Sequence, residues 1–167
     1  MFLFLTKRPS NINKYIPESW LENPPINVMF GTSISDQESA NTLIPQLLQV
    51  NGKRFLSVEP MLEKITLDSI WLECPECNGS KSIALYEKGE HIGGMACPKC
   101  INHQGVVSGI HWVICGGESG HNKRPFNCDW GRSLRDQCKA ADVPFFFKQV
   151  DKVQPIPEDL NIREFYN

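Results

Sequence analysis

Five short apolar segments constrain the fold of this chain more than any other feature of its sequence. They are rich in β-branched and aromatic residues, and turn signals or helix-like stretches separate them, which is typical of strands in a mostly parallel α/β sheet. The chain has 167 residues, enough for one ordinary domain. We therefore expect an α/β fold that forms a single domain over residues 1–167. The predicted strands are Phe2–Thr6, Val28–Ser33, Arg54–Val58, Ile110–Cys115 and Pro144–Gln149.

Helical periodicity fills several intervals between these strands. Apolar residues recur at helical spacing over Ala40–Leu48, after Ser35, which we expect to cap the helix with Glu38 as its capping-box partner. Asp129 is the expected cap of a second helix, and a shorter helix is predicted over Ser10–Trp20. A closed (β/α) barrel needs about eight strands, so five parallel strands form either an open sheet or part of a barrel.

Polar side chains follow every predicted strand, at the end where parallel α/β folds bind their ligands. Acids, bases and hydroxyls would converge there on one mouth suited to binding an anion together with an amine. The alternative is that each strand end simply faces solvent; we favour a shared mouth because Glu59, Glu118 and Lys148 would all contribute to it. The residues expected to line the mouth are Lys7, Arg8, Ser33, Glu59, Glu118, Ser119, Lys148 and Gln149.

The long excursion between the third and fourth strands, Met61–Gly109, carries two CxxC motifs that are separated by 19 residues. Two thiolates three residues apart can bind one ion, and two such pairs at this spacing predict a structural zinc ribbon. Iron in a rubredoxin-like site is the alternative. A closed four-cysteine site has no open coordination position, so the metal would have a structural role. We expect a ribbon inserted over residues 73–106, with a β-hairpin between the motifs and with Cys74, Cys77, Cys97 and Cys100 as the zinc ligands.

Charge and segment lengths narrow the classes of function. Asp plus Glu number 19 and Lys plus Arg number 17, so the net charge of -2 gives no basic excess that would favour nucleic acid. No apolar stretch approaches the roughly 20 residues of a membrane-spanning helix, and the apolar start at Phe2–Leu5 is too short for a signal peptide. We therefore expect a cytoplasmic protein with no membrane partner.

Of the other three cysteines, Cys115 and Cys138 are expected in the core, and Cys128 near a helix start.

Four segments resemble an uncharacterised protein family that is widespread in bacteriophages and bacteria and is similar to radical SAM enzymes. These segments are Phe2–Pro9, Arg54–Pro60, Trp112–Gly120 and Ser133–Gln149. The resemblance implies a partial (β/α) barrel of about five parallel strands. Family members usually begin with a further segment whose three cysteines bind a 4Fe-4S cluster and thereby S-adenosylmethionine. The resemblance also relates Gly116-Gly117-Glu118 to the segment by which radical SAM enzymes hold the methionine amino group.

Two functions from different classes follow from these observations. In the first, the chain is the carboxyl-terminal portion of a phage-type radical SAM-like protein, inactive alone, whose mouth binds a small polar ligand. S-adenosylmethionine and a 4Fe-4S cluster would then require an upstream segment or subunit that completes the barrel. In the second, the chain is a non-enzymatic phage or prophage module whose zinc ribbon binds a host protein or nucleic acid, in the cytoplasm of a bacterial host. The sequence leaves open whether the chain is an enzyme.

Overall fold

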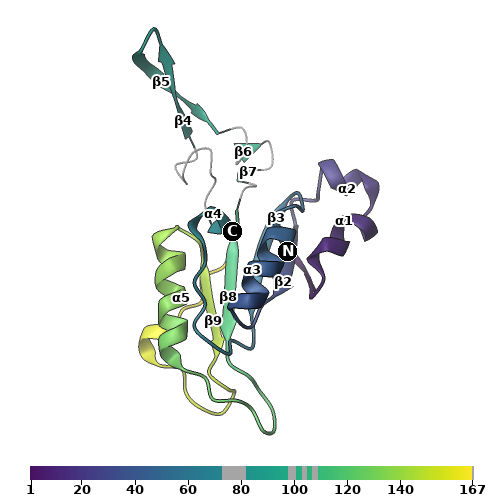
Figure 1. The fold of residues 1–167 in the computed structure, drawn as a ribbon, viewed down its shortest axis with the longest axis vertical. Coiled ribbons are helices and arrows are strands. Elements are labelled where there is room, and N and C mark those ends of the chain that lie inside the picture. Colours follow the sequence, from purple (N-terminus) through teal and green to yellow (C-terminus); the bar gives the residue numbers. More distant parts are fainter. Residues whose placement is uncertain (73–81, 98–100, 103–104, 107–108, 167) are drawn as a thin grey trace.

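A five-stranded parallel sheet forms the centre of the protein (Figure 1). The computed structural model describes residues 1–72, 82–97, 101–102, 105–106 and 109–166. Every strand of the sheet pairs in parallel with the next one along the chain, so the strand order β1-β2-β3-β8-β9 contains no reversal. The expected α/β fold and its five strands are confirmed. Their bounds are β1 (Phe2–Thr6), β2 (Val28–Ser33), β3 (Lys53–Val58), β8 (Trp112–Gly116) and β9 (Phe145–Gln149).

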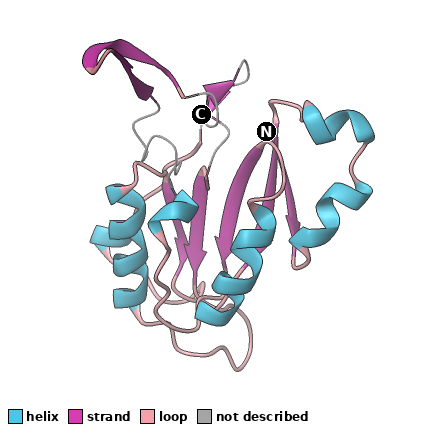
Figure 2. Ribbon diagram, turned by 45° about the horizontal axis from the view of Figure 1, so that its top comes forward, coloured by secondary structure: helices cyan, strands magenta, loops and turns pink. Residues whose placement is uncertain are grey.

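Helices cover one face of this sheet, and the main hydrophobic core lies beneath them (Figure 2). The principal helices are α3 (Gln37–Leu47) and α5 (Cys128–Ala140). Strand side chains such as Phe30, Leu56 and Phe147 are buried on this face. Right-handed crossovers place every connecting helix on the same side of a sheet whose strand order never reverses, which explains the one-sided helix layer. None of the helices in the described ranges is long and apolar enough to cross a membrane.

The opposite side of the sheet, which we call the open face, carries a smaller apolar cluster. Met29, Phe55 and Trp112 are buried there. The C-terminal segment, which follows the short helix η2 (Glu158–Leu160), covers the amino end of this face. Trp112 Nε1 donates a hydrogen bond to the carbonyl oxygen of Glu164 at 2.9 Å, and the Phe165 ring centroid lies 5.8 Å from that of Trp112.

The same C-terminal segment also covers the outer edge of β9. The amide of Phe147 donates to the carbonyl oxygen of Ile162 at 3.0 Å, and the amide of Glu164 donates to that of Phe145 at 3.2 Å. An antiparallel bridge joins Phe146 to Arg163. The backbone groups at this edge of the sheet are therefore hydrogen-bonded within the chain.

The part of the excursion between Leu72 and Gly109 leaves and rejoins the body of the protein at the amino ends of the strands. Helix α4 (Ser69–Leu72) precedes this part, and the amide of Ile110 donates to the carbonyl oxygen of Trp71 at 2.9 Å. Gly109 approaches so closely that a Cβ there would lie 2.6 Å from the carbonyl oxygen of Leu72. The expected hairpin is confirmed as antiparallel β4 (Ser82–Glu87) and β5 (Glu90–Ala96), and a second small pair is β6 (Ile101–Asn102) with β7 (Gly105–Val106).

Two expected helix caps lie at other residues. Asp36, not Ser35, caps α3: its carboxylate accepts from the amide of Ser39 at 2.7 Å, while Ser39 Oγ accepts from the amide of Asp36 at 3.1 Å. The capping box therefore uses Ser39 instead of Glu38. Helix α5 begins after Asn127, whose side-chain oxygen accepts from the amide of Asp129 at 2.9 Å, because a short amide side chain caps as well as a carboxylate does.

The helix predicted over Ser10–Trp20 is divided into three short pieces. They are η1 (Pro9–Asn11), α1 (Ile12–Tyr15) and α2 (Glu18–Glu22). Proline restricts the residue before it to extended backbone, and Ile16 accordingly has φ -75° and ψ 155° before Pro17. This break ends α1 at Tyr15, and α2 begins after Pro17.

Candidate ligand site at the carboxyl end of the sheet

An ion pair between two strands forms the centre of the candidate site. Glu59 directly follows β3 and Lys148 lies on β9, and Lys148 Nζ is 3.0 Å from Glu59 Oε1. The side chain of Glu59 is 17% exposed and that of Lys148 is 52% exposed. Ser57 Oγ donates to Glu59 Oε2 at 3.3 Å. Since β8 lies between β3 and β9, the pair spans the carboxyl end of β8, as expected for a shared mouth.

Two consecutive glycines at the end of β8 allow close approaches, one to this pair and one to the loop after β9. A Cβ on Gly116 would lie 3.1 Å from Glu59 Oε1, so a side chain there would push the carboxylate away from its present position. A Cβ on Gly117 would overlap the carbonyl oxygen of Val150. Gln149 holds this approach in place, because its Nε2 donates to the carbonyl oxygen of Gly117 at 3.1 Å and its own carbonyl accepts from the Gly117 amide at 3.0 Å.

Glu118 faces Arg124 within the loop between β8 and α5. Arg124 Nη2 donates to Glu118 Oε1 at 2.8 Å, and Arg124 Nε donates to Oε2 at 2.8 Å. The backbone amide of Arg124 also donates to Oε2 at 2.9 Å. These bonds lower the pKa of Glu118 to about 2, with the Arg124 side chain as the largest cause. A ligand amine would have to share this carboxylate with Arg124, and the role implied for Glu118 stays a prediction.

Asp151 is a residue of the mouth that sequence reasoning missed. Its carboxylate accepts from the amides of Val153 and Gln154 at 2.9 and 2.7 Å, and Lys123 Nζ lies 3.1 Å from it. The side chain is 6% exposed, and the hydrogen bonds from Gln154 and Val153 hold its pKa well below the usual range. Asp151 thereby joins the loop after β9 to the loop after β8. The sequence does contain a signal for this role, because Asp151 follows the end of β9 by two residues and precedes a polar turn, where aspartate commonly accepts hydrogen bonds from backbone amides.

The remaining predicted residues of the mouth divide into two groups. Ser33 stands opposite Ser57 in the register of β2 and β3, beside the ion pair. Lys7 and Arg8 are exposed at the end of β1, and Ser119 is exposed beyond Glu118. Within the described ranges, no hydrogen bond or ion pair connects these last three residues to Glu59 or Lys148. The structure thus brings the pair together with Ser33, Ser57 and Gln149, and it leaves Lys7, Arg8 and Ser119 at the rim.

The cysteines outside the excursion lie apart from this site. Cys115 and Cys138 are buried in the core beneath the helices, where burial raises the pKa of Cys138 to about 12 and that of Cys115 well above its usual value. Cys128 is half-buried at the start of α5. Among the residues that the structure describes, no group of three or more His, Cys, Asp or Glu could hold a metal ion.

Three of the four predicted zinc ligands, Cys74, Cys77 and Cys100, lie outside the described residues. The fourth, Cys97, is buried at the end of the β4–β5 hairpin region. Zinc binding therefore stays a prediction. The predicted ribbon is attached at the amino end of the sheet, where Trp71 and Ile110 meet, whereas Glu59 and Lys148 lie at the carboxyl end (Figure 1).

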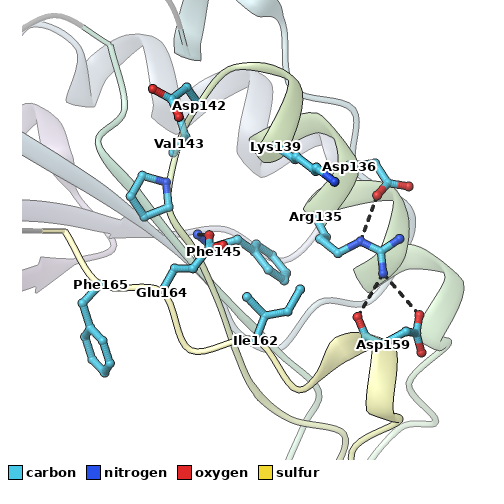
Figure 3. A pocket seen from close by; sticks show the side chains of 11 residues that line it. Arg135, Asp136, Lys139, Asp142, Val143, Phe145, Asp159, Ile162, Glu164 and Phe165 are labelled. Carbon is cyan, nitrogen blue, oxygen red and sulfur yellow. Dashed lines mark hydrogen bonds and ion pairs between the residues drawn. The ribbon is translucent and has the colours of Figure 1, made fainter.

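A further hollow of about 630 Å³ lies between α5 and the C-terminal segment (Figure 3). Several of its charged side chains have partners on its own rim. Arg135 Nε is 2.8 Å from Asp136 Oδ1, and Arg135 Nη1 is 3.2 Å from Asp159 Oδ2. The Glu164 carboxylate accepts from the amide of Phe145 at 2.8 Å. These contacts connect the C-terminal segment to α5 and β9.

Comparison with known proteins identifies the family of this chain. Neither the curated proteins nor the solved structures contain a match to this chain. A family described as "Protein of unknown function (DUF5131)" matches residues 1–159, which includes every strand of the sheet and the mouth. The expectation of an uncharacterised family is thereby confirmed. The chain belongs to the DUF5131 family.

Proposed function

We propose that this chain is the carboxyl-terminal portion of a radical SAM-like (β/α) barrel protein of phage or bacterial origin. Its mouth binds a small polar ligand that carries an amine and a carboxylate, in the cytoplasm of a bacterial host. The observation that carries this proposal is the pair of Glu59 and Lys148, which stands at the carboxyl end of the sheet with Lys148 half exposed. Ligands of parallel α/β folds bind at this end of the strands.

The organisation of the sheet supports a partial barrel. Sequential parallel strands with helices on one face are the arrangement of a (β/α) barrel wall, in which the other face points inward. The open face carries the apolar side chains of Met29, Phe55 and Trp112, as an inward face would. The C-terminal segment covers its amino end, so the carboxyl end is the accessible one. The remaining strands would come from an upstream segment or a partner subunit.

A ligand with both charges suits the Glu59–Lys148 pair for an electrostatic reason. A charge that loses its partner in a partly buried site is costly. A ligand ammonium could take the place of Lys148 beside Glu59, and a ligand carboxylate could take the place of Glu59 beside Lys148. Each side chain would then keep a partner of opposite charge. Ser57 keeps the Glu59 carboxylate in place during this exchange by donating to its other oxygen.

The described cysteines do not fit a 4Fe-4S cluster, because Cys115 and Cys138 are buried beneath the helices and Cys128 lies at the start of α5. We therefore derive no step through such a cluster from this chain. The cluster and the reaction belong to the proposed upstream segment or subunit. What this chain would contribute is the binding and orientation of the ligand at the mouth.

Isothermal titration of S-adenosylmethionine and of methionine into the purified protein tests the proposal. Each charge-assisted hydrogen bond contributes about 1.5–3 kcal/mol, so Glu59→Gln and Lys148→Met should each raise the Kd roughly 10- to 100-fold. Lys139→Met, an exposed lysine near the opposite end of the sheet, is the matched control and should leave the Kd unchanged. Absence of binding by the wild type, or binding that both mouth variants retain, would refute the proposal.

The β4–β5 hairpin favours a second candidate function, the binding of a host protein. The hairpin projects from the end of the sheet where the excursion is attached (Figure 1). Its exposed large apolar side chains are Leu85, Tyr86, Ile92 and Met95, which suit a protein partner better than a phosphate backbone. Retention on DNA or RNA at low salt that disappears as salt rises would instead identify nucleic acid as the partner.

A further inference from the structure

Arg163 of the C-terminal segment lies beside the mouth, on the open face of the sheet. It stands opposite Phe146 in the antiparallel bridge, and residues that stand opposite each other in an antiparallel pair share one face. Phe146 packs against the open-face cluster, so the side chain of Arg163 lies on the open face as well. Glu59 shares this face, because side chains alternate along β3 and Phe55 belongs to the same cluster.

Three contacts hold the guanidinium of Arg163 in place. Its Nη2 donates to the carbonyl oxygen of Lys148 at 3.4 Å, and its Nη1 donates to that of Ile162 at 3.2 Å. Its central carbon lies over the ring of Phe146, 4.7 Å from the centroid, in a cation–π contact. A guanidinium has five N–H donors, so further donors stay available to a ligand. A second cation is thereby fixed next to Lys148, whose ammonium pairs with Glu59.

The charge of Arg163 exceeds what the acids of the mouth neutralise. Its side chain is exposed, and no carboxylate among the residues that the structure describes forms an ion pair with it. The acids of the mouth already have other cations as partners, in the pairs Glu59–Lys148, Glu118–Arg124 and Asp151–Lys123. Arg163 is therefore a positive charge beside a pair that is neutral in itself.

Arg163 and the ion pair lie over different strands. The Glu59 carboxylate lies over the end of β8, since a Cβ on Gly116 would be 3.1 Å from its Oε1. The guanidinium of Arg163 lies over Phe146 of the next strand, β9. Neighbouring strands are about 4.8 Å apart, a distance that a short carbon chain spans. One small ligand can therefore place an amine beside Glu59 and a second, anionic end beside Arg163.

From this arrangement we infer that the ligand of the mouth is an anionic amino acid, whose side chain ends in an acid group that Arg163 binds. The inference rests on the proposed function and names the class of its ligand. An ammonium beside Glu59 and a carboxylate beside Lys148 leave the charge of the site unchanged. A second carboxylate, or a phosphate, then neutralises Arg163, and the planar fork of a guanidinium suits either group. A neutral amino acid leaves this cation without an anionic partner.

Isothermal titration with matched pairs of amino acids tests this inference. Glutamate differs from glutamine in the charge at the end of its side chain, and O-phosphoserine differs from serine by its phosphate. We expect at least one anionic member to bind at least about tenfold more tightly than its neutral counterpart, and the pair concerned identifies the acid group. Arg163→Gln should abolish this preference and leave the Kd of methionine unchanged. A purely structural role of Arg163 would instead alter the binding of neutral and anionic ligands alike.

Further variants make this test specific. Arg163→Lys keeps the charge and should retain part of the preference, whereas Lys14→Gln, which removes an exposed charge of α1, should leave the preference unchanged. Equal affinities within both pairs of amino acids, or a preference that Arg163→Gln retains, would overturn the inference. Methionine binding that depends on Glu59 and Lys148 would in that case show that the proposed function stands. Absence of binding by all of these amino acids would overturn both.

Discussion

Replacement of Arg54 by methionine should destabilise the protein strongly. Arg54 lies on β3 with only 5% of its surface exposed. Its Nε donates to the carbonyl oxygen of Gly109 at 2.9 Å, and its Nη1 donates to those of Val50 and Leu48 at 2.7 and 3.3 Å. Burial lowers its pKa to about 10, so the guanidinium remains protonated at neutral pH. Arg54 thereby joins the loop before β3 to the end of the excursion.

The expected magnitude follows from these three contacts. Arg54→Met keeps an unbranched apolar stem but removes every donor, and it leaves three carbonyl oxygens near the core without this partner. Hydrogen bonds to charged groups contribute about 1.5–3 kcal/mol each, and part of that gain offsets the desolvation of the guanidinium. We expect a net loss of about 3 kcal/mol in the free energy of unfolding. That is a large fraction of the roughly 5–15 kcal/mol typical of a domain.

Urea unfolding, followed by circular dichroism and tryptophan fluorescence, measures this change. Arg8→Met is the matched control, because Arg8 is exposed and its side chain forms no ion pair within the described ranges; it should change the unfolding free energy by less than about 0.5 kcal/mol. Arg54→Lys should recover only part of the loss, since one ammonium group cannot reproduce the planar fork of the guanidinium. A loss below about 1 kcal/mol in Arg54→Met would refute the reasoning.

Three further predictions concern the mouth and the excursion. Gly117→Ala should cost at least about 2 kcal/mol of unfolding free energy in urea, because its Cβ would overlap Val150, whereas Gly94→Ala, whose Cβ would find its nearest atom at 3.6 Å, should not. The pKa of Asp151 is lowered in the folded protein, so its carboxylate stabilises the fold at pH values above the pKa that it has in the unfolded chain. This stabilisation is lost as the pH falls toward the pKa of the folded state. Asp151→Asn should therefore make the melting temperature decline less steeply between about pH 5 and pH 2. Plasma mass spectrometry should find one zinc per chain and none in Cys97→Ser, while iron with visible absorption would contradict the zinc assignment.

The strands could be predicted because each is an apolar run that needs burial on at least one face. Phe2–Thr6 and Val28–Ser33 occur in the structure with the predicted bounds. Helix starts were less predictable, since Ser35 and Asp36 are adjacent residues that both cap helices well. Only the backbone geometry decides between them, and it places the carboxylate of Asp36 on the amide of Ser39.

In the candidate site, too, the residues on strands could be predicted, whereas the contacts within loops could not. Glu59 and Lys148 could be predicted to converge because their positions follow from the strands that carry them. The partners Arg124 and Asp151 could not, because their contacts depend on how two long loops fold back on themselves. Sequence spacing contains little information on such loop conformations, whereas a parallel sheet fixes which strand ends are neighbours.

The close contact between Leu72 and Gly109 has a consequence for how this protein can vary. Leu72 and Gly109, which flank the predicted ribbon, lie next to each other, so the inserted part connects two neighbouring points of the fold. Lengthening a closed loop adds only a slowly growing entropic cost. Substitution of a short linker, or of an unrelated small domain, at these two residues should preserve the sheet and the mouth at its far end. The excursion is thus an exchangeable module, and the attachment point is a natural site for grafting.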